Sequence, residues 1–148
     1  MSGLESLYQE LILDHSKRRV GFGLADEEGR SATSHQHNPL CGDEITLRAV
    51  VEDGVVRAVT WEGAGCSISQ ASASMLSALV EEEGGMPREQ ASALIDGFRT
   101  SLRSRGTVPL DEETFSDAAA LSGVSKYTAR VKCAMLAWVA LEDVLSRS

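Results

Sequence analysis

The sequence predicts an α+β fold in which helices cover a small antiparallel sheet of about three strands. Three observations lead to this prediction. Apolar residues near the N-terminus recur at helical spacing, residues 44–61 alternate between apolar and polar side chains around one turn, and the chain beyond residue 66 returns to helical spacing. The order helix, strands, helices is typical of a sheet with helices on one face.

The first element is a short amphipathic helix over residues 4–16. Its apolar face is formed by Leu4, Leu7, Leu11 and Ile12. His15 stands at the end of this helix, where we expect its ring to bond the last helix carbonyls. Residues 17–40 are rich in Gly, Ser, Asn and His, and this composition predicts a long loop.

A β-hairpin follows the loop. Apolar and polar side chains alternate over residues 45–51, which predicts a strand with one buried face. The dipeptide Asp53-Gly54 is a strong hairpin-turn signal. Residues 55–61 then form the predicted returning strand, and a Gly-Ala-Gly sequence breaks it just before Cys66.

Helical spacing of apolar residues predicts four segments beyond the hairpin. They are residues 67–82, a helix that Pro87 opens and that continues through Phe98, a weaker pattern over 113–121, and a last helix from Thr128 through Val144. Gly84-Gly85 ends the first of them, residues 104–112 form a predicted loop, and Ser122-Gly123 ends the weak helix.

Four large side chains are expected in the core rather than in a binding site. Trp61 and Trp138 fall on predicted apolar faces, and Met75 and Met135 do so as well.

Length and composition limit the classes of function. The chain has 148 residues, 43% of them hydrophobic, so we expect a single domain over residues 1–148 with its own core. Its 22 acidic and 14 basic residues give a net charge of −8, which argues against binding nucleic acid or an anionic membrane. No apolar run approaches the roughly 20 residues that span a bilayer, and no secretory signal is recognisable, so we expect a cytoplasmic protein.

The three cysteines of the chain fall at the ends of predicted elements. Cys41 opens the hairpin, Cys66 lies between a strand and a helix, and Cys133 is near the start of the last helix. Asp43 stands two residues after Cys41, so in extended backbone both side chains point the same way. Three thiolates and a carboxylate suit zinc or an iron–sulfur cluster better than magnesium or calcium.

Spacing alone leaves a second interpretation open. The cysteines could be three unrelated small apolar residues, with Asp43 a turn residue, because Cys-x-Asp is not a tight metal signature and long intervals separate the cysteines.

Three separated motifs carry a resemblance to a known family. They are NPLCGD at residues 38–43, GAGCSISQAS at residues 63–72 and ARVKCA at residues 129–134. In this order they resemble the NifU-like iron–sulfur assembly proteins, and the closer match is to the SufU branch. The resemblance extends over nearly the whole chain and implies the NifU-like or IscU-like sandwich as the fold.

Two features place the chain nearer to SufU than to IscU. IscU-type proteins carry a His just before the last motif cysteine, where this chain has Lys132. SufU-type proteins carry an extra helical segment before the last motif, and residues 85–110 look like that segment.

The resemblance implies a zinc ion held by Cys41, Asp43, Cys66 and Cys133. It implies docking on a pyridoxal-phosphate cysteine desulfurase of the SufS type, where a partner side chain takes over a zinc position and releases Cys41. Cys41 would then accept persulfide sulfur and pass it to downstream iron–sulfur scaffold proteins. Such a chain is a sulfurtransferase that works only with its desulfurase.

Arg130 is the second candidate for a direct role. It lies three residues before Cys133, so on a helix the two side chains project to about one side. With Lys132 it could offset the charge of the site or steady a persulfide. The alternative is an ordinary solvated surface arginine.

Three other functions compete with sulfur transfer. One is an IscU-type scaffold on which iron or a [2Fe–2S] cluster is assembled, against which Lys132 in place of His argues. Another is a purely structural zinc module that recruits a partner. The last is an independent thiol hydrolase, which would need a His base beside a free cysteine.

His35 and His37 precede Cys41 closely and could form a second pair of ligands. Their polar neighbours favour a solvated loop, and the preferred ligand set is already complete without them.

Overall fold

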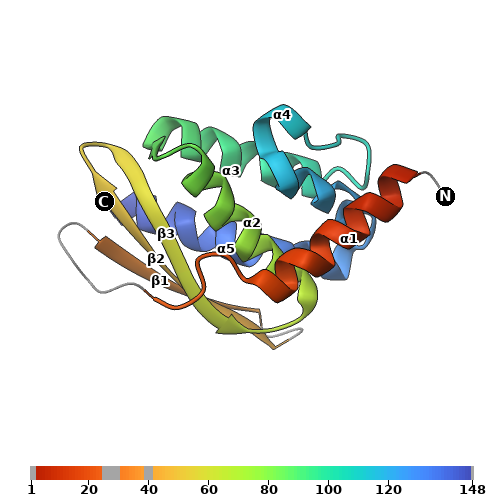
Figure 1. Ribbon diagram of the computed structural model, residues 1–148, viewed down its shortest axis with the longest axis horizontal. Coiled ribbons are helices and arrows are strands. Elements are labelled where there is room, and N and C mark those ends of the chain that lie inside the picture. The colour runs from red at the N-terminus through yellow and green to blue at the C-terminus, as the bar shows by residue number, and fades with distance from the viewer. Residues whose placement is uncertain (1–2, 25–30, 39–41, 148) are drawn as a thin grey trace.

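A four-stranded antiparallel sheet in the order β1-β2-β3-β4 carries helices on one face (Figure 1). The structure is a computed structural model that describes residues 3–24, 31–38 and 42–147, with side chains from residue 8 onward. In chain order the elements are α1 (Gly3–Arg18), β1 (Ser31–Asn38), β2 (Asp43–Glu52), β3 (Val55–Ala64), α2 (Ser67–Glu82), β4 (Met86–Pro87), α3 (Arg88–Leu102), α4 (Glu112–Phe115), the 3-10 helix η1 (Ser116–Lys126) and α5 (Thr128–Arg147). The predicted α+β class is confirmed.

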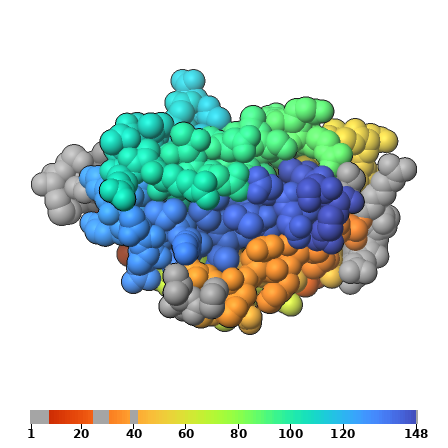
Figure 2. Space-filling model, turned by 180° about the vertical axis from the view of Figure 1, so that it is seen from behind, coloured from red at the N-terminus to blue at the C-terminus, as the bar shows by residue number. Residues whose placement is uncertain are grey.

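The sheet buries one side of each long strand. In β2 the odd-numbered residues Ile45, Leu47 and Ala49 are almost fully buried, whereas the residues between them are partly exposed. This alternation is the period of two that the sequence predicts. Helices α2 and α5 pack on the buried face, and α5 crosses the molecule between α3 and β1 (Figure 2).

The β2–β3 hairpin forms at the predicted turn. Asp53 and Gly54 have φ values of +53° and +73°, so both adopt the left-handed conformation that two-residue hairpin turns require.

The sheet has two more strands than the hairpin. β1 lies inside the segment 17–40 that composition predicts to be a loop, and it pairs with β2 along its whole length. Its residues are polar because it is an edge strand with one exposed face, and such strands carry little apolar signal. Pro87 lies in the two-residue strand β4 and directly precedes α3, instead of opening that helix.

Helix α2 is the centre of the helical layer and is built from small residues. Ser72 donates to the Ala134 carbonyl (2.6 Å) and accepts from the Trp138 indole (2.9 Å). Ser77 donates to the Val59 carbonyl (2.7 Å). These bonds let hydroxyls lie in the core without loss of hydrogen bonding, and small side chains allow close packing against α1, α5 and β3.

The large side chains occupy the core as expected. Trp138 stacks on Phe98 with ring centroids 4.0 Å apart and an interplanar angle of 7°. Trp61 is fully buried and its indole donates to the Val20 carbonyl (2.8 Å). Met75 and Met135 are buried too, which confirms the prediction for all four residues.

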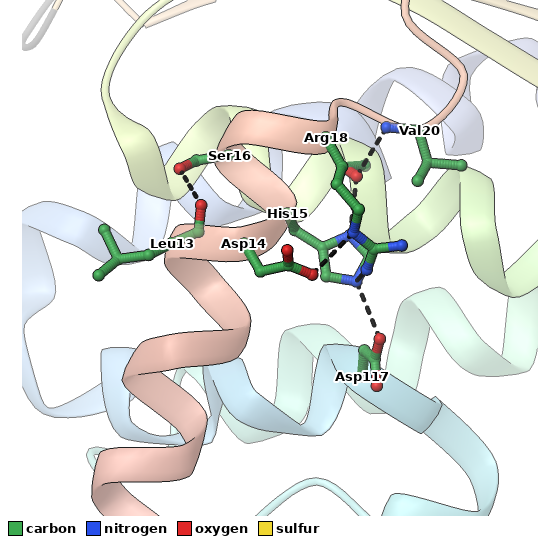
Figure 3. A network of polar contacts seen from close by, with 8 residues as sticks. Leu13, Asp14, His15, Ser16, Arg18, Val20 and Asp117 are labelled. Atoms are coloured by element: carbon green, nitrogen blue, oxygen red, sulfur yellow. Dashed lines mark hydrogen bonds and ion pairs between the residues drawn. The ribbon is translucent and has the colours of Figure 1, made fainter.

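His15 does not cap its helix. The helix continues to Arg18, and the His15 ring is fully buried between three elements (Figure 3). Nδ1 lies 2.7 Å from the Ser74 hydroxyl on α2, and Nε2 lies 2.9 Å from the Asp117 carboxylate on η1. The prediction was wrong because ring partners far away in sequence replace the local carbonyls.

The predicted weak helix over 113–121 is also different in the structure. A short α4 is followed by a run of 3-10 turns that passes through Ser122-Gly123 and ends at Lys126. Ser122 and Ser125 each donate to the carbonyl three residues earlier, at 2.8 and 2.7 Å. Such side-chain bonds favour tight turns over a regular α-helix.

Among the helices of the described residues, none has the length and apolar character to cross a membrane.

Candidate metal centre

Three of the four predicted ligands converge at one end of the sheet. Asp43 is the first residue of β2, Cys66 caps the N-terminus of α2, and Cys133 lies in α5. Their ligand atoms all lie within 4.8 Å of one another. Asp43 and Cys133 are buried and Cys66 is half-buried, so the group opens to solvent on the Cys66 side.

The Asp43 carboxylate is held by the start of α2. Its Oδ1 accepts a hydrogen bond from the backbone N–H of Cys66 (3.0 Å), and its Oδ2 lies 3.4 Å from the Cys66 sulfur. The N–H groups of a helix N-terminus favour a negative charge. The carboxylate is therefore oriented with one oxygen on the helix and the other on the thiol.

Glycine at position 65 allows this approach. A Cβ atom at Gly65 would lie 2.6 Å from Asp43 Oδ1 and 2.6 Å from Ser69 Oγ, closer than real Cβ atoms come. Gly63 meets the Glu44 backbone in the same way, with a Cβ at 2.2 Å from the carbonyl oxygen. At both positions a side chain larger than hydrogen would collide with a neighbouring part of the chain.

Ser69 is a further member of the site and is not one of the predicted ligands. It is buried, donates to the Cys66 carbonyl (3.1 Å) and has its hydroxyl 4.0 Å from the Cys66 sulfur. Gln70 supports the same turn by donating to the Gly65 carbonyl (2.9 Å). The signal was available, because a Ser three residues after a cysteine that begins a helix lies on the cysteine's side of the first turn.

Cys133 is deeper than expected. It is the sixth residue of α5 and is 1% exposed, with its sulfur 3.8 Å from the Ala129 carbonyl. It therefore belongs to the second turn of the helix and not to its end. Burial between α5 and the sheet keeps this thiol away from solvent.

Cys41 lies outside the described residues. Asn38 and Gly42, which flank this segment, are joined by a hydrogen bond from the Gly42 N–H to the Asn38 carbonyl (2.8 Å). Gly42 has a left-handed φ of +71°.

The donor set of the three described residues fits zinc. Two sulfurs and one carboxylate are ligands that zinc takes in tetrahedral sites, and soft sulfur donors are poor ligands for magnesium or calcium. The carboxylate is already oriented by a backbone hydrogen bond, as outer partners orient ligands in metal sites.

Arg130 and Lys132 face different cavities. Arg130 is exposed and, with Cys66 and Tyr127, lines a cavity of about 700 Å³ between the starts of α2 and α5, η1 and α1. Lys132 lines a second cavity, of about 570 Å³, together with Arg103. The two cations line different cavities because side chains two residues apart on a helix project in different directions.

The wall of the larger cavity includes Tyr8 of α1. Its hydroxyl donates to the Glu112 carboxylate (2.6 Å), and this hydrogen bond, with burial and the charge of Glu112, raises the pKa of Tyr8 to about 12. Tyr8 is therefore a neutral phenol that ties α1 to α4 at the edge of the cavity.

His35 and His37 do not join this group. They lie in strand β1 instead of a loop, and both are exposed.

Comparisons with known proteins agree with the predicted fold and family. The model of the NifU-like N-terminal domain matches residues 7–134. The zinc-dependent sulfurtransferase SufU of Bacillus subtilis is 37% identical over 146 residues, covering 99% of this chain and 94% of that protein. The iron–sulfur cluster assembly scaffold protein IscU of Streptococcus pyogenes is 36% identical over 148 residues, covering 100% and 88%.

A solved structure supports the same relationship. A protein from Fervidobacterium islandicum, described as an iron–sulfur cluster assembly scaffold for the SUF system, has a TM-score of 0.78 and 29% identity, covering 97% of this chain and 99% of that one. The predicted family is confirmed: the chain belongs to the family of NifU-like N-terminal domains.

Proposed function

We propose that this chain is a zinc-dependent sulfur acceptor that takes persulfide sulfur from a SufS-type cysteine desulfurase for iron–sulfur cluster assembly. The observation that carries the proposal is the convergence of Asp43, Cys66 and Cys133 within 4.8 Å at one end of the sheet. The likeness to the SufU of Bacillus subtilis, which is named a zinc-dependent sulfurtransferase, supports the choice of zinc and of reaction.

Cys41, Asp43, Cys66 and Cys133 are the proposed ligands. When bound, zinc would hold the cysteines as thiolates, the form in which sulfur attacks. The protein's own contribution is orientation: the Cys66 N–H fixes Asp43, and Gly65 leaves room for the carboxylate.

Cys41 is the proposed acceptor. Its thiolate attacks the outer sulfur of the donor's cysteine persulfide, the donor's S–S bond breaks, and the donor cysteine leaves as a thiolate. Cys41 then carries the persulfide, so no oxidant or reductant is consumed. Cys133 is a poor candidate for this step, since its sulfur is buried in α5 and a donor could not reach it.

The cavity beside Cys66 is the proposed entry for the donor. It is open at the half-buried ligand, it is of the size that takes a few side chains, and its lining combines apolar groups with Arg130. A persulfide is anionic, so an arginine at the cavity would attract it.

An assembly scaffold is the second candidate. The 36% identity to the IscU of Streptococcus pyogenes favours it, and the same sulfur ligands would suit an iron–sulfur cluster. In that case the purified chain would carry iron and labile sulfide.

The deciding experiment measures metal content and the turnover of a SufS-type desulfurase, read as alanine, with and without this chain. We expect about one zinc per chain and a clear gain in desulfurase turnover when the chain is present. The variant Cys41→Ala should stay folded but give no gain. Ser92→Ala, at an exposed position of α3 that does not line the cavity beside Cys66, is the control and should keep the gain. Iron with labile sulfide and no gain would replace sulfur transfer by the scaffold function. Zinc with no gain, and an unfolded Cys41→Ala, would point to a structural zinc module.

A further inference from the structure

We propose that His35, His37 and Glu44 form a second site for a divalent transition-metal ion on the exposed face of the sheet. This site is separate from the group at Asp43, and its test does not depend on the proposed sulfur transfer.

The register of β1 and β2 places these residues together. His37 pairs with Glu44 and His35 pairs with Thr46 in neighbouring rungs of the antiparallel ladder. Because side chains alternate along a strand, all four project from the same face. The residues between the histidines and on either side of them turn inward: Ser34 and Asn38 are buried, and Gln36 donates to Ser34 (3.0 Å).

This face of the sheet is open. The described helices pack on the other face (Figure 1). The His35 and Glu44 side chains are 55% and 52% exposed, so a hydrated ion could reach them.

His35 is already oriented as a ligand. Its Nδ1 lies 2.7 Å from the Thr46 hydroxyl, and its Nε2 lies 3.6 Å from Glu44 Oε2. If Nδ1–H donates to Thr46, the lone pair of Nε2 points toward the carboxylate. Metal-binding imidazoles almost always have their second nitrogen fixed by such a hydrogen bond.

His37 supplies the second imidazole. It is exposed and stands directly across from Glu44, where facing Cβ atoms are about 4.5–5.5 Å apart. His37 also lines the cavity that contains Lys132, so its ring would have to turn toward Glu44 to complete the group.

Two imidazole nitrogens and one carboxylate define the class of ion. This set, with positions left for water, suits ferrous iron or zinc, whereas magnesium and calcium prefer oxygen ligands. Glu62, which pairs with Thr46 from β3, adds a second exposed negative charge. Arg48, two residues after Thr46 on β2, donates to the Thr33 hydroxyl on β1 (3.0 Å).

The proposed second site lies close to the Asp43 group. Glu44 directly follows Asp43, so the two groups lie at the same end of β2 on opposite faces of the sheet. An ion held by the histidines would be separated from the Asp43, Cys66 and Cys133 group only by the sheet itself.

The first test counts ions. Purified protein with its tightly bound metal is dialysed in separate arms against zinc, against magnesium and, without oxygen, against ferrous iron. We expect the wild type to bind one more ion per chain than the double variant His35→Gln/His37→Gln. Glu52→Gln, which removes an exposed carboxylate at the far end of β2, should bind as many ions as the wild type. The excess is a difference between variants, so it stands even if the Asp43 group holds no zinc. No excess, or equal uptake of magnesium, would overturn the proposal.

The second test identifies the ligands. The chain has three histidines, and the buried His15 serves as an internal reference. On addition of zinc, the ring ¹⁵N signals of His35 and His37 should shift while those of His15 stay. Thr46→Val should change the tautomer of His35 and weaken binding about 10- to 100-fold, the usual loss when an outer partner is removed. Ring signals that stay fixed at saturating zinc would contradict the assignment.

Discussion

Single atoms decide the geometry at the residue scale. Asp43 reaches the start of α2 only because residue 65 has no side chain, and its carboxylate lies between the Cys66 amide and the Cys66 sulfur. The neighbouring Ser69 fills the remaining side of the turn. The arrangement is tight, so it should be sensitive to one added methyl group.

Gly65→Ala tests this directly. The new Cβ would push the Asp43 carboxylate away from the site, so zinc affinity should fall by about tenfold or more while the fold persists. Competition with a coloured chelator measures the affinity. Gly123→Ala is the matched control, since a Cβ there meets nothing within 4 Å, and it should bind zinc like the wild type. Equal affinity in both variants would remove Gly65 from the account.

At the scale of elements, one buried ring joins three helices. His15 on α1 contacts Ser74 on α2 and Asp117 on η1, and Ser74 also accepts from the Val20 N–H (2.9 Å). Removal of the ring would leave a hole in the core and take one of the two hydrogen-bond partners from the fully buried Ser74 hydroxyl.

His15→Ala should therefore lower the free energy of unfolding by about 1–3 kcal/mol, measured by urea denaturation. Asp14→Ala, on the same helix, removes only an exposed ion pair with Arg18 and should cost less than about 1 kcal/mol. A loss no larger than that of Asp14→Ala would mean that His15 does not hold the helices together.

Sequence patterns predicted the elements that have a strong local signal. The alternation of β2, the Asp53-Gly54 turn and the apolar spacing of α2, α3 and α5 are such signals. β1 was missed because its polar residues take their strand conformation from pairing with β2, which no local pattern encodes. The 3-10 segment was missed because serine hydroxyls, and not apolar spacing, determine its turns.

In the candidate site too, local motifs predicted some features, whereas others depend on how distant elements pack. The motifs identified Asp43, Cys66 and Cys133, which the fold brings together. The depth of Cys133 and the contacts of Ser69 depend on how α5 and α2 pack, so spacing could not supply them.

At the scale of the whole molecule, Asp43 begins β2, Cys66 is the N-cap of α2 and Cys133 lies in α5, so a metal ion bound by these three residues would join elements far apart in the chain. Binding free energy at such a site is partly folding free energy. A metal at 100 times its dissociation constant adds about 2.7 kcal/mol of stability.

Removal of zinc by a chelator should therefore lower the melting temperature, by roughly 5–10 °C for a chain of this size. Calorimetry with and without chelator measures the shift. Asp43→Ala is the control and should show a smaller shift, because it binds the metal less tightly. An unchanged melting temperature in the wild type would contradict a metal that links the elements.

The cavity beside Cys66 is the surface that a desulfurase would meet. Arg130→Glu places a negative charge at the cavity beside Cys66, and the gain in desulfurase turnover should weaken about tenfold or more at low salt. Arg103→Glu, an exposed arginine at the other cavity, should keep the gain. Equal losses in both variants would indicate a general charge effect and not a role of Arg130.

Zinc K-edge X-ray absorption of the purified protein tests the proposed zinc site, because it reports which atoms surround the metal. We predict about three sulfurs near 2.3 Å and one oxygen near 2.0–2.2 Å in the wild type, with the oxygen contribution changed in Asp43→Ala. A shell without sulfur, or iron and sulfide in place of zinc, would contradict it.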